Sequence, residues 1–304
     1  MRVAAVVVTF NRRVLLEQCL RALACQSRMA DIVVVVDNAS TDGTPEWLSG
    51  WLADHMPCAV PHFLSENTGG AGGFHEGLAL AIEHGADWVW MMDDDAKPSS
   101  SALESLLEVA SDPGNVYGSL AVKGEDTSWL TTLTDEDNRG VNKVVDVPRC
   151  ARVQSLPFLG FMIHRSLVHK IGLPDAGFFI AADDIEYCIR AQTAGASIII
   201  AGQSRIEHPK SESYVARLPF RSLTCLRLAP WKRYYDTRNR LLIARKYYGV
   251  RLVTQTIPGS FVRLFAALIY EPNRLAQSWA FFAGMTDGIL GMKGRRHTFW
   301  GIKP

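Results

Sequence analysis

Two uninterrupted runs of β-branched and small apolar residues constrain the fold of this chain more than any other feature. "VAAVVV" at 3–8 and "IVVVV" at 32–36 contain no polar residue, so both faces of each strand are expected to be buried. Between them lies "VLLEQCLRALACQ", whose apolar residues recur at helical spacing. Buried strands joined by helices predict an α/β fold, a Rossmann-like, mainly parallel sheet flanked by helices.

The alternation of strands and helices continues to about residue 210. "TPEWLSGWLADH" and "SSSALESLLEVA" predict helices, whereas "DWVWMM" and "SIIIAG" predict strands. Residues 123–150 are polar without clear periodicity, and we interpret them as a variable excursion. After Pro209, helical patterns dominate. We therefore predict a ligand-binding domain over residues 1–215 and a C-terminal helical region over residues 216–304.

The net charge of +1 hides a sharp asymmetry between these regions. Residues 1–215 contain 16 Lys and Arg against 28 Asp and Glu, whereas residues 216–304 contain 16 against 3. The second region is also rich in aromatic and apolar residues, which favours an interfacial membrane surface over a nucleic-acid site. A packed helical subdomain or a dimer interface, with the opposite charges paired, is the alternative. The cations expected to face lipid include Lys232, Arg233, Arg238 and Arg240.

Cysteine usage and the N-terminal sequence bear on the compartment. The six cysteines are scattered with no CxxC pair, which argues against a zinc finger or a disulfide framework and favours a reducing cytoplasm. "MRVAAVVVTFNR" reads as a first strand rather than a signal peptide. No run of 18 uncharged apolar residues is present, so we predict no transmembrane helix.

Polar residues follow the first two predicted strands. Thr9 and Asp37 stand where the strands end, and ligands of parallel sheets bind beyond these carboxyl ends. An Asp at this place can accept a hydrogen bond from a base or a ribose, although ordinary turn chemistry is the alternative. Further on, "NTGGAGGF" at 67–74 predicts a glycine loop in which the backbone approaches a ligand closely, or else a flexible turn. Because His75 takes the last position of a GxGxxG pattern, a nicotinamide-dependent dehydrogenase is poorly supported.

Three consecutive acidic residues follow the apolar run "ADWVWMM". In an extended chain, alternation places Asp93 and Asp95 on one side and Asp94 on the other. Two converging carboxylates form a site for a hard cation, to which nucleotide phosphates add oxygens. A solvated acidic turn is the alternative.

A second acidic cluster occurs in "FFIAADDIEYCIR" at 178–190. Asp183 and Asp184 follow an apolar run, so partial burial is expected to raise the pKa of one of them toward that of a general base. A helix with acidic residues in its first turn is the alternative. His208, in "RIEHPK", follows the strand "SIIIAG" and could return to the same strand-end cleft, or be structural.

Five segments, taken in their order along the chain, resemble family 2 glycosyltransferases with the GT-A fold, and the resemblance covers roughly residues 1–210. The segments are "VVVTFNR", "VVDNASTDGT", "MMDDDA", "ADDIEYCIR" and "IEH". The resemblance implies a catalytic domain that binds a nucleotide sugar and Mn²⁺ or Mg²⁺. It implies metal ligation by Asp93, Asp95 and His208 and a catalytic base at Asp184. The donor-binding residues implied are Thr9, Asn11, Arg12, Asp37, Asn67, Gly70, Gly73 and Asp94, and the acceptor-binding residues are Gly160, Phe179 and Asp183.

The same resemblance narrows the substrates. "NTGGAGGF" is similar to a segment of bacterial galactofuranosyltransferases, which implies UDP-galactofuranose as the donor. "YYDTRNR" at 234–240 is similar to segments of rhamnosyltransferases, which makes dTDP-rhamnose the alternative. The implied reaction is an inverting transfer to a hydroxyl of a glycan or polyprenyl-linked glycan, in the synthesis of bacterial cell-surface polysaccharide.

Together with the charge asymmetry, this implies a cytoplasmic enzyme bound peripherally to the inner face of the plasma membrane, with no nucleic-acid partner and with homo-oligomerisation left open. A sugar nucleotidyltransferase and a non-catalytic sugar-nucleotide-binding protein are alternatives of other classes.

Overall fold

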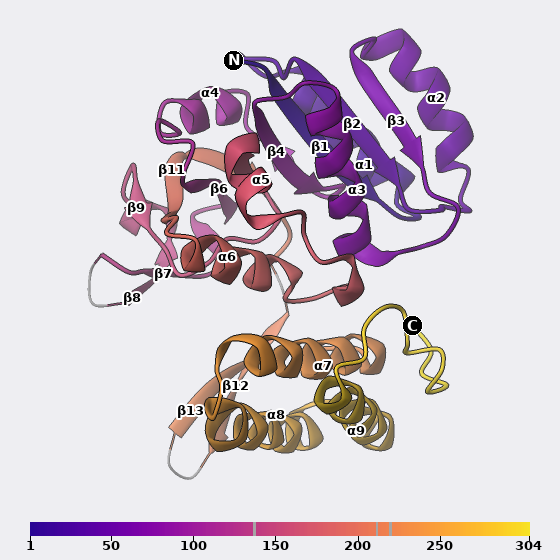
Figure 1. Cartoon of the computed structure of the whole chain (residues 1–304), viewed down its shortest axis with the longest axis vertical. Coiled ribbons are helices and arrows are strands. Elements are labelled where there is room, and N and C mark those ends of the chain that lie inside the picture. Colours follow the sequence, from indigo (N-terminus) through magenta and orange to yellow (C-terminus); the bar gives the residue numbers. More distant parts are fainter. Residues whose placement is uncertain (136–137, 211, 219–220) are drawn as a thin grey trace. The chain divides into compact units, whose positions relative to one another are not determined.

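The computed structural model describes residues 1–135, 138–210, 212–218 and 221–304, and its chain divides into two compact units (Figure 1). The N-terminal unit comprises Met1–Asp175 and Asp184–Lys210, and the C-terminal unit comprises Ala176–Asp183 and Ser211–Pro304. These units differ from the predicted division after residue 215 in two places, because the second unit begins at Ser211 and also includes one earlier loop. Residues 176–183 belong by their contacts to the C-terminal unit, although they precede the last helix of the N-terminal unit.

The N-terminal unit contains a large sheet and its covering helices. Its strands are β1 (Val3–Thr9), β2 (Ile32–Asp37), β3 (Ala59–Phe63), β4 (Trp88–Asp93), β5 (Lys97–Pro98), β6 (Val116–Lys123), β7 (Asp126–Leu133), β8 (Arg139–Lys143), β9 (Ala151–Arg152), β10 (Phe161–His164) and β11 (Ile198–Glu207). Its helices are α1 (Arg13–Ala24), α2 (Thr44–His55), α3 (Gly69–Glu83), α4 (Ala102–Leu107), the 3₁₀ turn η1 (Val144–Asp146), α5 (Arg165–Ile171) and α6 (Asp183–Thr193), whose first residue belongs by contacts to the other unit.

The strands follow the order β3-β2-β1-β4-β10-β6-β11-β5, and the first four run parallel. Strand β10 is antiparallel to both β4 and β6, while β11 is parallel to β6. The predicted mainly parallel sheet flanked by helices is thereby confirmed.

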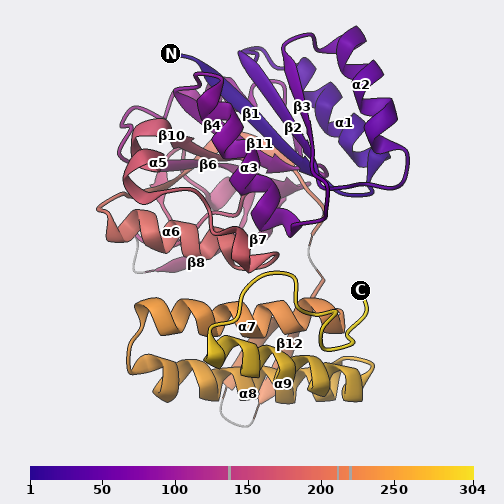
Figure 2. The ribbon, with the colours of Figure 1, turned by 45° about the vertical axis from the view of Figure 1, so that its right-hand side comes forward.

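The apolar runs are buried on both faces because helices cover both sides of the sheet (Figure 2). Val3, Ala5 and Val7 of β1 pack into a core with α1, α2 and α4. The even-numbered residues of the same strand pack into a second core with α3, α5 and α6. Alternation of side chains along a strand therefore divides one apolar sequence run between two cores.

The polar stretch 123–150 is not a structureless excursion. Strand β7 pairs antiparallel with β6 and with β8, so most of this stretch extends the sheet as a hairpin. Thr127, Ser128 and Thr131 of β7 are buried although they are polar. The segment lacks a clear apolar pattern because these hydroxyl residues share its inner positions with only a few aliphatic ones, such as Leu133 and Val141.

The C-terminal unit is helical, but it begins with a hairpin that the sequence did not predict. Its elements are η2 (Ala176–Phe178), β12 (Ser213–Leu218), β13 (Arg221–Leu226), α7 (Pro230–Tyr247), the π-helical segment η3 (Leu252–Thr256), α8 (Ile257–Tyr270) and α9 (Arg274–Leu290). Helices α7 and α9 pack closely. A Cβ at Gly284 would lie 2.4 Å from the carbonyl oxygen of Tyr234, so glycine permits this close approach.

Candidate active site

Three strands deliver polar residues to one edge of the sheet. Thr9 lies opposite Asp37 in the β1–β2 pair, and Val8 lies opposite Asp93 in the β1–β4 pair. Because β1 lies between β2 and β4, the three carboxyl ends are neighbours. Thr9 and Asp37 therefore stand at strand ends, as predicted, and Asp93 ends the neighbouring strand at the same edge.

The acidic triplet changes conformation after its first member. Strand β4 ends at Asp93, and the amide of Ala96 donates to the carbonyl oxygen of Asp93 at 3.2 Å, which makes Asp94 and Asp95 the central residues of a turn. The expectation that an extended chain carries alternating side chains through all three residues is wrong beyond Asp93. The turn lets Asp94 and Asp95 share one partner, the guanidinium of Arg12.

Asp94 is the most enclosed of the three carboxyl groups, with 3% of its surface exposed. It accepts a hydrogen bond from the Thr9 hydroxyl at 2.8 Å, and Arg12 Nη1 lies 3.3 Å from its other oxygen. Burial raises the pKa of Asp94 to about 6, against the opposing effect of Arg12 and Thr9. Arg12 also lies 3.2 Å from Asp95 Oδ2, so this one cation compensates two carboxylates.

His208 is brought to the acidic turn by strand pairing. Strand β11 pairs antiparallel with β5, with Glu207 opposite Lys97, so the residue after β11 meets the turn before β5. His208 Nε2 lies 3.4 Å from Asp95 Oδ1. Burial disfavours the charged form of Asp95, but His208 and Arg12 outweigh it and hold the pKa of this carboxyl below its ordinary value.

The turn offers donor atoms that suit a divalent cation, although a complete ligand set is not preassembled. Within the residues that the structure describes, no group of three or more His, Cys, Asp or Glu side chains converges as a ready-made site. Asp95 Oδ1 and His208 Nδ1 are nevertheless buried without a hydrogen-bond partner among those residues. Carboxylate oxygens suit Mg²⁺ and Mn²⁺, and imidazole is a common ligand of metal ions in proteins. Asp95 and His208 therefore fit such an ion, and the participation of Asp93 stays a prediction.

Asp37 presents an acceptor atom that protein groups leave unused. It is almost fully buried, and its Oδ2 accepts a hydrogen bond from the Ser40 amide at 3.0 Å. Its Oδ1 is buried without a partner in the described part of the chain. A buried carboxylate oxygen without a donor is costly unless a ligand satisfies it. Asp37 therefore suits hydrogen bonding to a base or a ribose.

Asn11 joins the two loops that border this edge. Its backbone amide donates to Ser40 Oγ at 2.8 Å, and its side-chain oxygen accepts from the Thr41 amide at 2.7 Å. Its φ of 53° places it in the left-handed region, which asparagine tolerates better than most residues. Asn11 therefore shapes the site through these loops.

The predicted glycine loop is the first turn of a helix, because α3 begins at Gly69. A Cβ at Gly73 would lie 2.4 Å from Val8 Cγ1, so this glycine allows α3 to pack on β1. Gly70 has no atom within 4 Å of such a Cβ and leaves open space at the helix N-terminus. Asn67 accepts a hydrogen bond from the Gly69 amide at 2.8 Å. Of the three predicted donor contacts here, Gly70 is the one that packing leaves open.

Asn38 lies at the same edge, although its sequence context, "DNAS", indicates only a turn. Its side-chain amide donates to the carbonyl oxygen of Gly69 at 2.7 Å, and its oxygen accepts from the Thr68 amide at 2.8 Å. It thus ties the end of β2 to the start of α3. Its position directly after Asp37 was the one sequence feature that could have indicated this role, but an asparagine is equally expected in a turn.

Asp184 lies in the first turn of α6. Its Oδ1 accepts a hydrogen bond from the Ile185 amide at 2.7 Å. The residue is half-buried as a whole, yet its carboxyl group is surrounded by protein, and this burial raises its pKa to about 6. Such a value suits a general base near neutral pH. Phe179 and Asp183, predicted to bind the acceptor, belong to the loop of the C-terminal unit that precedes it.

Gly160 is buried between strands. Its amide donates to the carbonyl oxygen of Met91 at 2.8 Å, and a Cβ would lie 2.6 Å from Ile206 Cδ1. Its φ of 80° also favours glycine. Packing thus accounts for this glycine, and its predicted contact with an acceptor stays a prediction.

The basic residues of the C-terminal unit do not all face outward as predicted. Arg233 is buried and forms an ion pair with Glu271 at 2.7 Å, and Arg238 is fully buried. Arg240 lies 2.9 Å from Asp236. Lys232 remains exposed. The expectation that all four cations face lipid is therefore wrong for Arg233 and Arg238, whose charges are used inside the unit.

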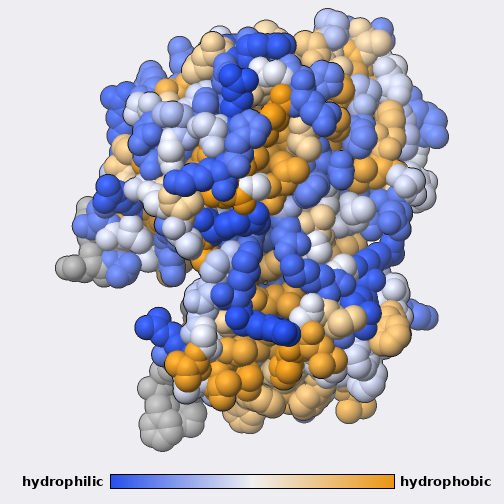
Figure 3. All heavy atoms as spheres, viewed as in Figure 1, coloured by the Kyte–Doolittle hydropathy of each residue, from blue (hydrophilic) through white to orange (hydrophobic). Residues whose placement is uncertain are grey.

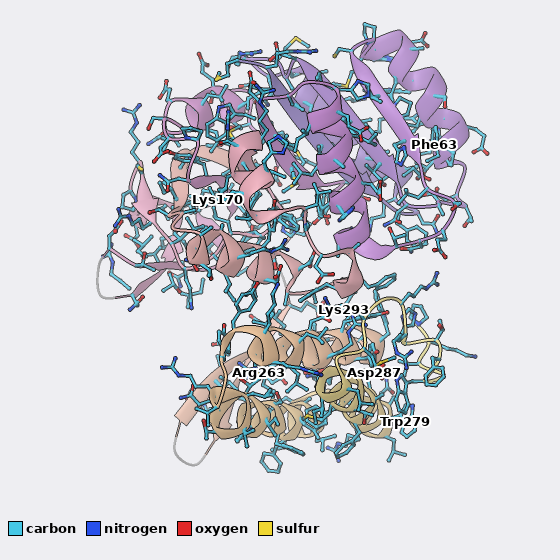
Figure 4. The ribbon with its side chains drawn as sticks, viewed as in Figure 1. Phe63, Lys170, Arg263, Trp279, Asp287 and Lys293 are labelled. Atoms are coloured by element: carbon cyan, nitrogen blue, oxygen red, sulfur yellow. The ribbon has the colours of Figure 1, made fainter. Side chains whose placement is uncertain are left out.

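An apolar surface is exposed instead on α8 and α9. Figure 3 shows apolar side chains gathered on the part of the C-terminal unit that carries these helices. Its large exposed side chains are Phe261, Phe265, Ile269, Leu275, Trp279, Phe282, Ile289 and Leu290. In Figure 4, Trp279 lies on the outer side of α9, whereas Asp287 lies toward α7, where it accepts a hydrogen bond from Tyr234.

The continuous helix Leu252–Tyr270 is long and apolar enough to cross a membrane, by length and composition alone, and 22% of its most apolar window is buried. The sequence criterion of an uncharged run missed it because Arg263 interrupts the run. Its inner residues, including Leu264 and Ala267, are buried in the unit.

Comparison with known proteins identifies relatives of this chain. The model of glycosyl transferase family 2 matches residues 4–172. The chain is 31% identical to galactofuranosyltransferase GlfT1 of Mycobacterium tuberculosis over 256 residues, 78% of this chain and 80% of the relative. It is 22% identical to dTDP-rhamnosyl transferase RfbF of Shigella flexneri, over 95% of this chain and 96% of the relative.

Two solved structures share the fold. GalNAc-T7 with UDP, GalNAc and Mn²⁺ superposes with a TM-score of 0.62 at 14% identity, covering 84% of this chain and 52% of that chain. The mannosyltransferase PcManGT from Pyrobaculum calidifontis, in complex with GDP-Man and Mn²⁺, superposes with a TM-score of 0.59 at 17% identity, covering 95% and 87%. The family model spans more than half of the chain, and the strand-end acidic cluster lies in the fold that these enzymes share. The chain therefore belongs to glycosyl transferase family 2 and is a glycosyltransferase.

Proposed function

We propose that the enzyme transfers galactofuranose from UDP-galactofuranose, with inversion, to a hydroxyl of a glycan or polyprenyl-linked glycan in the synthesis of a bacterial cell-surface polysaccharide. The observation that carries the proposal is the cluster of Arg12, Asp94, Asp95 and His208 beside the unsatisfied oxygen of Asp37. This combines acceptors for a nucleoside with charged groups for a diphosphate. The 31% identity to GlfT1 supports the donor sugar.

The nucleotide is held by the ends of β1, β2 and β4. Asp37 Oδ1 accepts a hydrogen bond from the base or the ribose, and Thr9 fixes the Asp94 carboxyl through its hydroxyl. Arg12 is half-exposed and already lies between Asp94 and Asp95. Its guanidinium can exchange one of these carboxylates for a phosphate group, because a carboxylate and a phosphate can each accept two hydrogen bonds from a guanidinium.

Asp95 and His208, with Asp93, are the residues that would hold Mn²⁺ or Mg²⁺, whose charge would offset that of the leaving diphosphate. The two structural neighbours that contain Mn²⁺ support this proposal. Two other side chains would act at the diphosphate site without binding the metal. Arg12 adds a fixed positive charge at the same edge of the sheet, and Asp94 holds that guanidinium while it accepts a hydrogen bond from Thr9.

Asp184 removes the proton from the acceptor hydroxyl as that oxygen attacks the anomeric carbon from the face opposite the diphosphate. The bond between the anomeric carbon and the diphosphate oxygen breaks in the same displacement, so the configuration inverts. The proton ends on the Asp184 carboxylate and the electron pair on the diphosphate. Positioned proton transfer of this kind is typically worth ~10²–10⁴ in rate.

A rhamnosyl donor is the second candidate, because RfbF aligns with 95% of this chain, including its C-terminal unit. Family membership decides against the other two classes considered from the sequence, a nucleotidyltransferase and a non-catalytic binding protein.

A donor panel tests the proposal. Purified enzyme with Mn²⁺ and a polyprenyl-linked glycan acceptor is given UDP-galactofuranose, UDP-galactopyranose, dTDP-rhamnose or GDP-mannose, and release of nucleoside diphosphate is measured. We expect acceptor-dependent release from UDP-galactofuranose. Selective turnover of dTDP-rhamnose would replace the proposed donor by the second candidate.

We further propose that the exposed apolar surface of α8 and α9 rests in the cytoplasmic leaflet of the plasma membrane. The occupant is taken to be anionic lipid because this apolar surface belongs to a region with 16 basic and 3 acidic residues. One face of α8 packs inside the unit while Phe261, Phe265 and Ile269 face outward. This two-sided character favours an interfacial position over a spanning one.

A further inference from the structure

The loop directly before Asp184 has an unfavourable backbone conformation. Phe179, Ala181 and Ala182 have φ angles of 64°, 70° and 61°. The left-handed region is disfavoured for residues with a Cβ, because this atom crowds the following carbonyl oxygen. Three such residues in so short a segment persist only when their surroundings fix them.

The side-chain amide of Asn239 is the main fixing group. Its Nδ2 lies 2.7 Å from the carbonyl oxygen of Ala181, 2.8 Å from that of Ile180 and 3.1 Å from that of Phe178. Asn239 is fully buried on α7. A single amide group therefore contacts carbonyls across the left-handed stretch, where water is excluded.

Arg238 orients that amide and adds contacts of its own. Its Nε donates to Asn239 Oδ1 at 2.8 Å, so the donor end of the Asn239 amide must face the loop. Its Nη2 donates to the carbonyl oxygen of Phe178 at 2.7 Å, and its Nη1 donates to that of Gly294 at 2.6 Å. This buried guanidinium binds backbone carbonyls on both the loop and the C-terminal segment.

Aromatic packing fixes the same loop from its side-chain face. The Phe179 ring stacks on Tyr235, with centroids 5.0 Å apart and an angle of 26° between the planes. The Tyr235 hydroxyl lies 2.7 Å from His297 Nδ1. One face of α7 therefore contacts the loop, because Tyr235, Arg238 and Asn239 are spaced i, i+3 and i+4 along the helix.

We propose that Arg238 and Asn239 are positioning residues for Asp184: they hold the strained loop in the conformation that aims the Asp184 carboxylate at the acceptor hydroxyl. The inference rests on the proposed function, in which Asp184 is the base. The contacts that fix the loop all lie within the C-terminal unit, and the loop is joined to Asp184 by the chain itself. A small misplacement of a reacting group is enough to lower the rate greatly.

The test replaces Asn239 by Asp, which keeps the side-chain shape but points an oxygen instead of a donor at the loop carbonyls. The matched control is Gln277→Glu, because Gln277 is also a buried amide of the C-terminal unit and donates to the carbonyl oxygen of Leu228. The measurements are kcat with the nucleotide sugar that the wild-type enzyme turns over, the Kd of UDP or dTDP with Mn²⁺ by calorimetry, and Tm.

We expect Asn239→Asp to lower kcat by on the order of 10- to 10²-fold with an unchanged nucleotide Kd. Gln277→Glu should lower Tm but retain kcat at temperatures well below its Tm. Equal kcat values for the two variants would overturn the inference, because the contacts would then be merely structural.

A second variant keeps the test independent of the folding of Asn239→Asp. Ala182→Val places a β-branched residue at a φ of 61°, whereas Ala176→Val alters the same loop outside the left-handed positions. We expect only Ala182→Val to lose kcat, and wild-type kcat in this variant would overturn the inference.

Asp184→Asn, assayed in parallel, separates the two levels of the proposal. If Asp184→Asn retains turnover, the proposed function of Asp184 fails. If it abolishes turnover while Asn239→Asp and Ala182→Val do not lower it, only the positioning inference fails.

Discussion

His208 Nε2 lies 3.4 Å from Asp95 Oδ1, although the two residues belong to different strand connections. The pairing of β11 with the two-residue strand β5 brings them together. Both side chains retain a buried atom without a hydrogen-bond partner in the described structure. Carboxylate and imidazole are side chains that bind metals, so this pair of neighbouring residues connects the fold to the predicted cofactor.

The first prediction concerns these two residues. We expect Asp95→Asn and His208→Gln each to weaken the Mn²⁺-dependent part of UDP binding by about tenfold or more, because each removes one ligand of a shared cation. Calorimetry of UDP with Mn²⁺ and with EDTA measures this part directly. Asp126→Asn, which alters an exposed carboxylate on β7 paired with Lys143, is the control and should bind as wild type. Equal UDP affinity in Mn²⁺ and EDTA for the wild-type enzyme would contradict the prediction.

The second prediction concerns the pH dependence of activity. Burial raises the pKa of Asp184 to about 6. Because a base must be ionised, kcat should rise with pH through about 6 and then level off. Asp184→Asn should lower kcat by ~10²-fold or more while UDP binding is retained. A pH–rate profile of the chemical step checks both, and a flat profile between about pH 5 and 8 would assign the proton transfer to another group.

The same pKa predicts a cost in stability. The folded-state pKa of Asp184 lies above its unfolded value of about 3.9, so the folded state binds more protons between these two values. Stability contributed by the protonated carboxyl is therefore present below about pH 4 and is lost as pH rises through about 6. Asp184→Asn, which is neutral at every pH, should have a higher Tm than wild type near pH 7.5 and a similar Tm near pH 4. A lower Tm for the variant near pH 7.5 would contradict the prediction and would show that ionised Asp184 stabilises the fold.

The third prediction separates two glycines of α3. Gly73→Ala should destabilise the protein by about 1–3 kcal/mol, because the new Cβ meets Val8 Cγ1 at 2.4 Å. Gly70→Ala should stabilise it by up to about 1 kcal/mol, because its Cβ meets no atom within 4 Å and alanine favours a helix. Urea denaturation measures both changes. UDP binding adds a second result: a loss of affinity in Gly70→Ala alone would support the predicted donor contact at this open helix end.

The fourth prediction concerns the membrane surface. The protein should co-sediment with liposomes that contain phosphatidylglycerol at low salt and be partly released at high salt, because the Debye length falls to about 8 Å at physiological ionic strength. The double variant Phe265→Ser with Trp279→Ser should bind less at every salt concentration, since salt does not weaken apolar contacts. Leu130→Ser, an equally exposed apolar residue of β7, should bind as wild type. Absence of binding to neutral and anionic liposomes alike, or a concentration-dependent dimer that the double variant abolishes, would assign the surface to protein contacts instead.

The sequence by itself determined the fold class and the place of the site. A strand that is buried on both faces requires a continuous apolar run such as residues 3–8. Because segments with helical spacing connect these runs, the sequence predicts a parallel sheet covered by helices. The carboxyl ends of neighbouring parallel strands meet at one edge, so Thr9, Asp37 and Asp93 could be gathered from local patterns alone. The acidic pair Asp183–Asp184 was found in the same way.

Only the tertiary structure decided which distant residues meet and which charges are used inside. No local pattern encodes the pairing of β5 with β11, so the contact between Asp95 and His208 depends on sheet topology. The sequence predicted Arg233 and Arg238 to be surface cations, because it shows that a residue is charged but not that its side chain is buried. The carboxylate partner of Arg233 lies far along the chain, and so do the backbone carbonyls that Arg238 binds in addition to its neighbour Asn239. Every residue type carries a backbone carbonyl, so the sequence does not mark these partners. For this reason the link between α7 and the loop before Asp184 emerges only when the chain is folded.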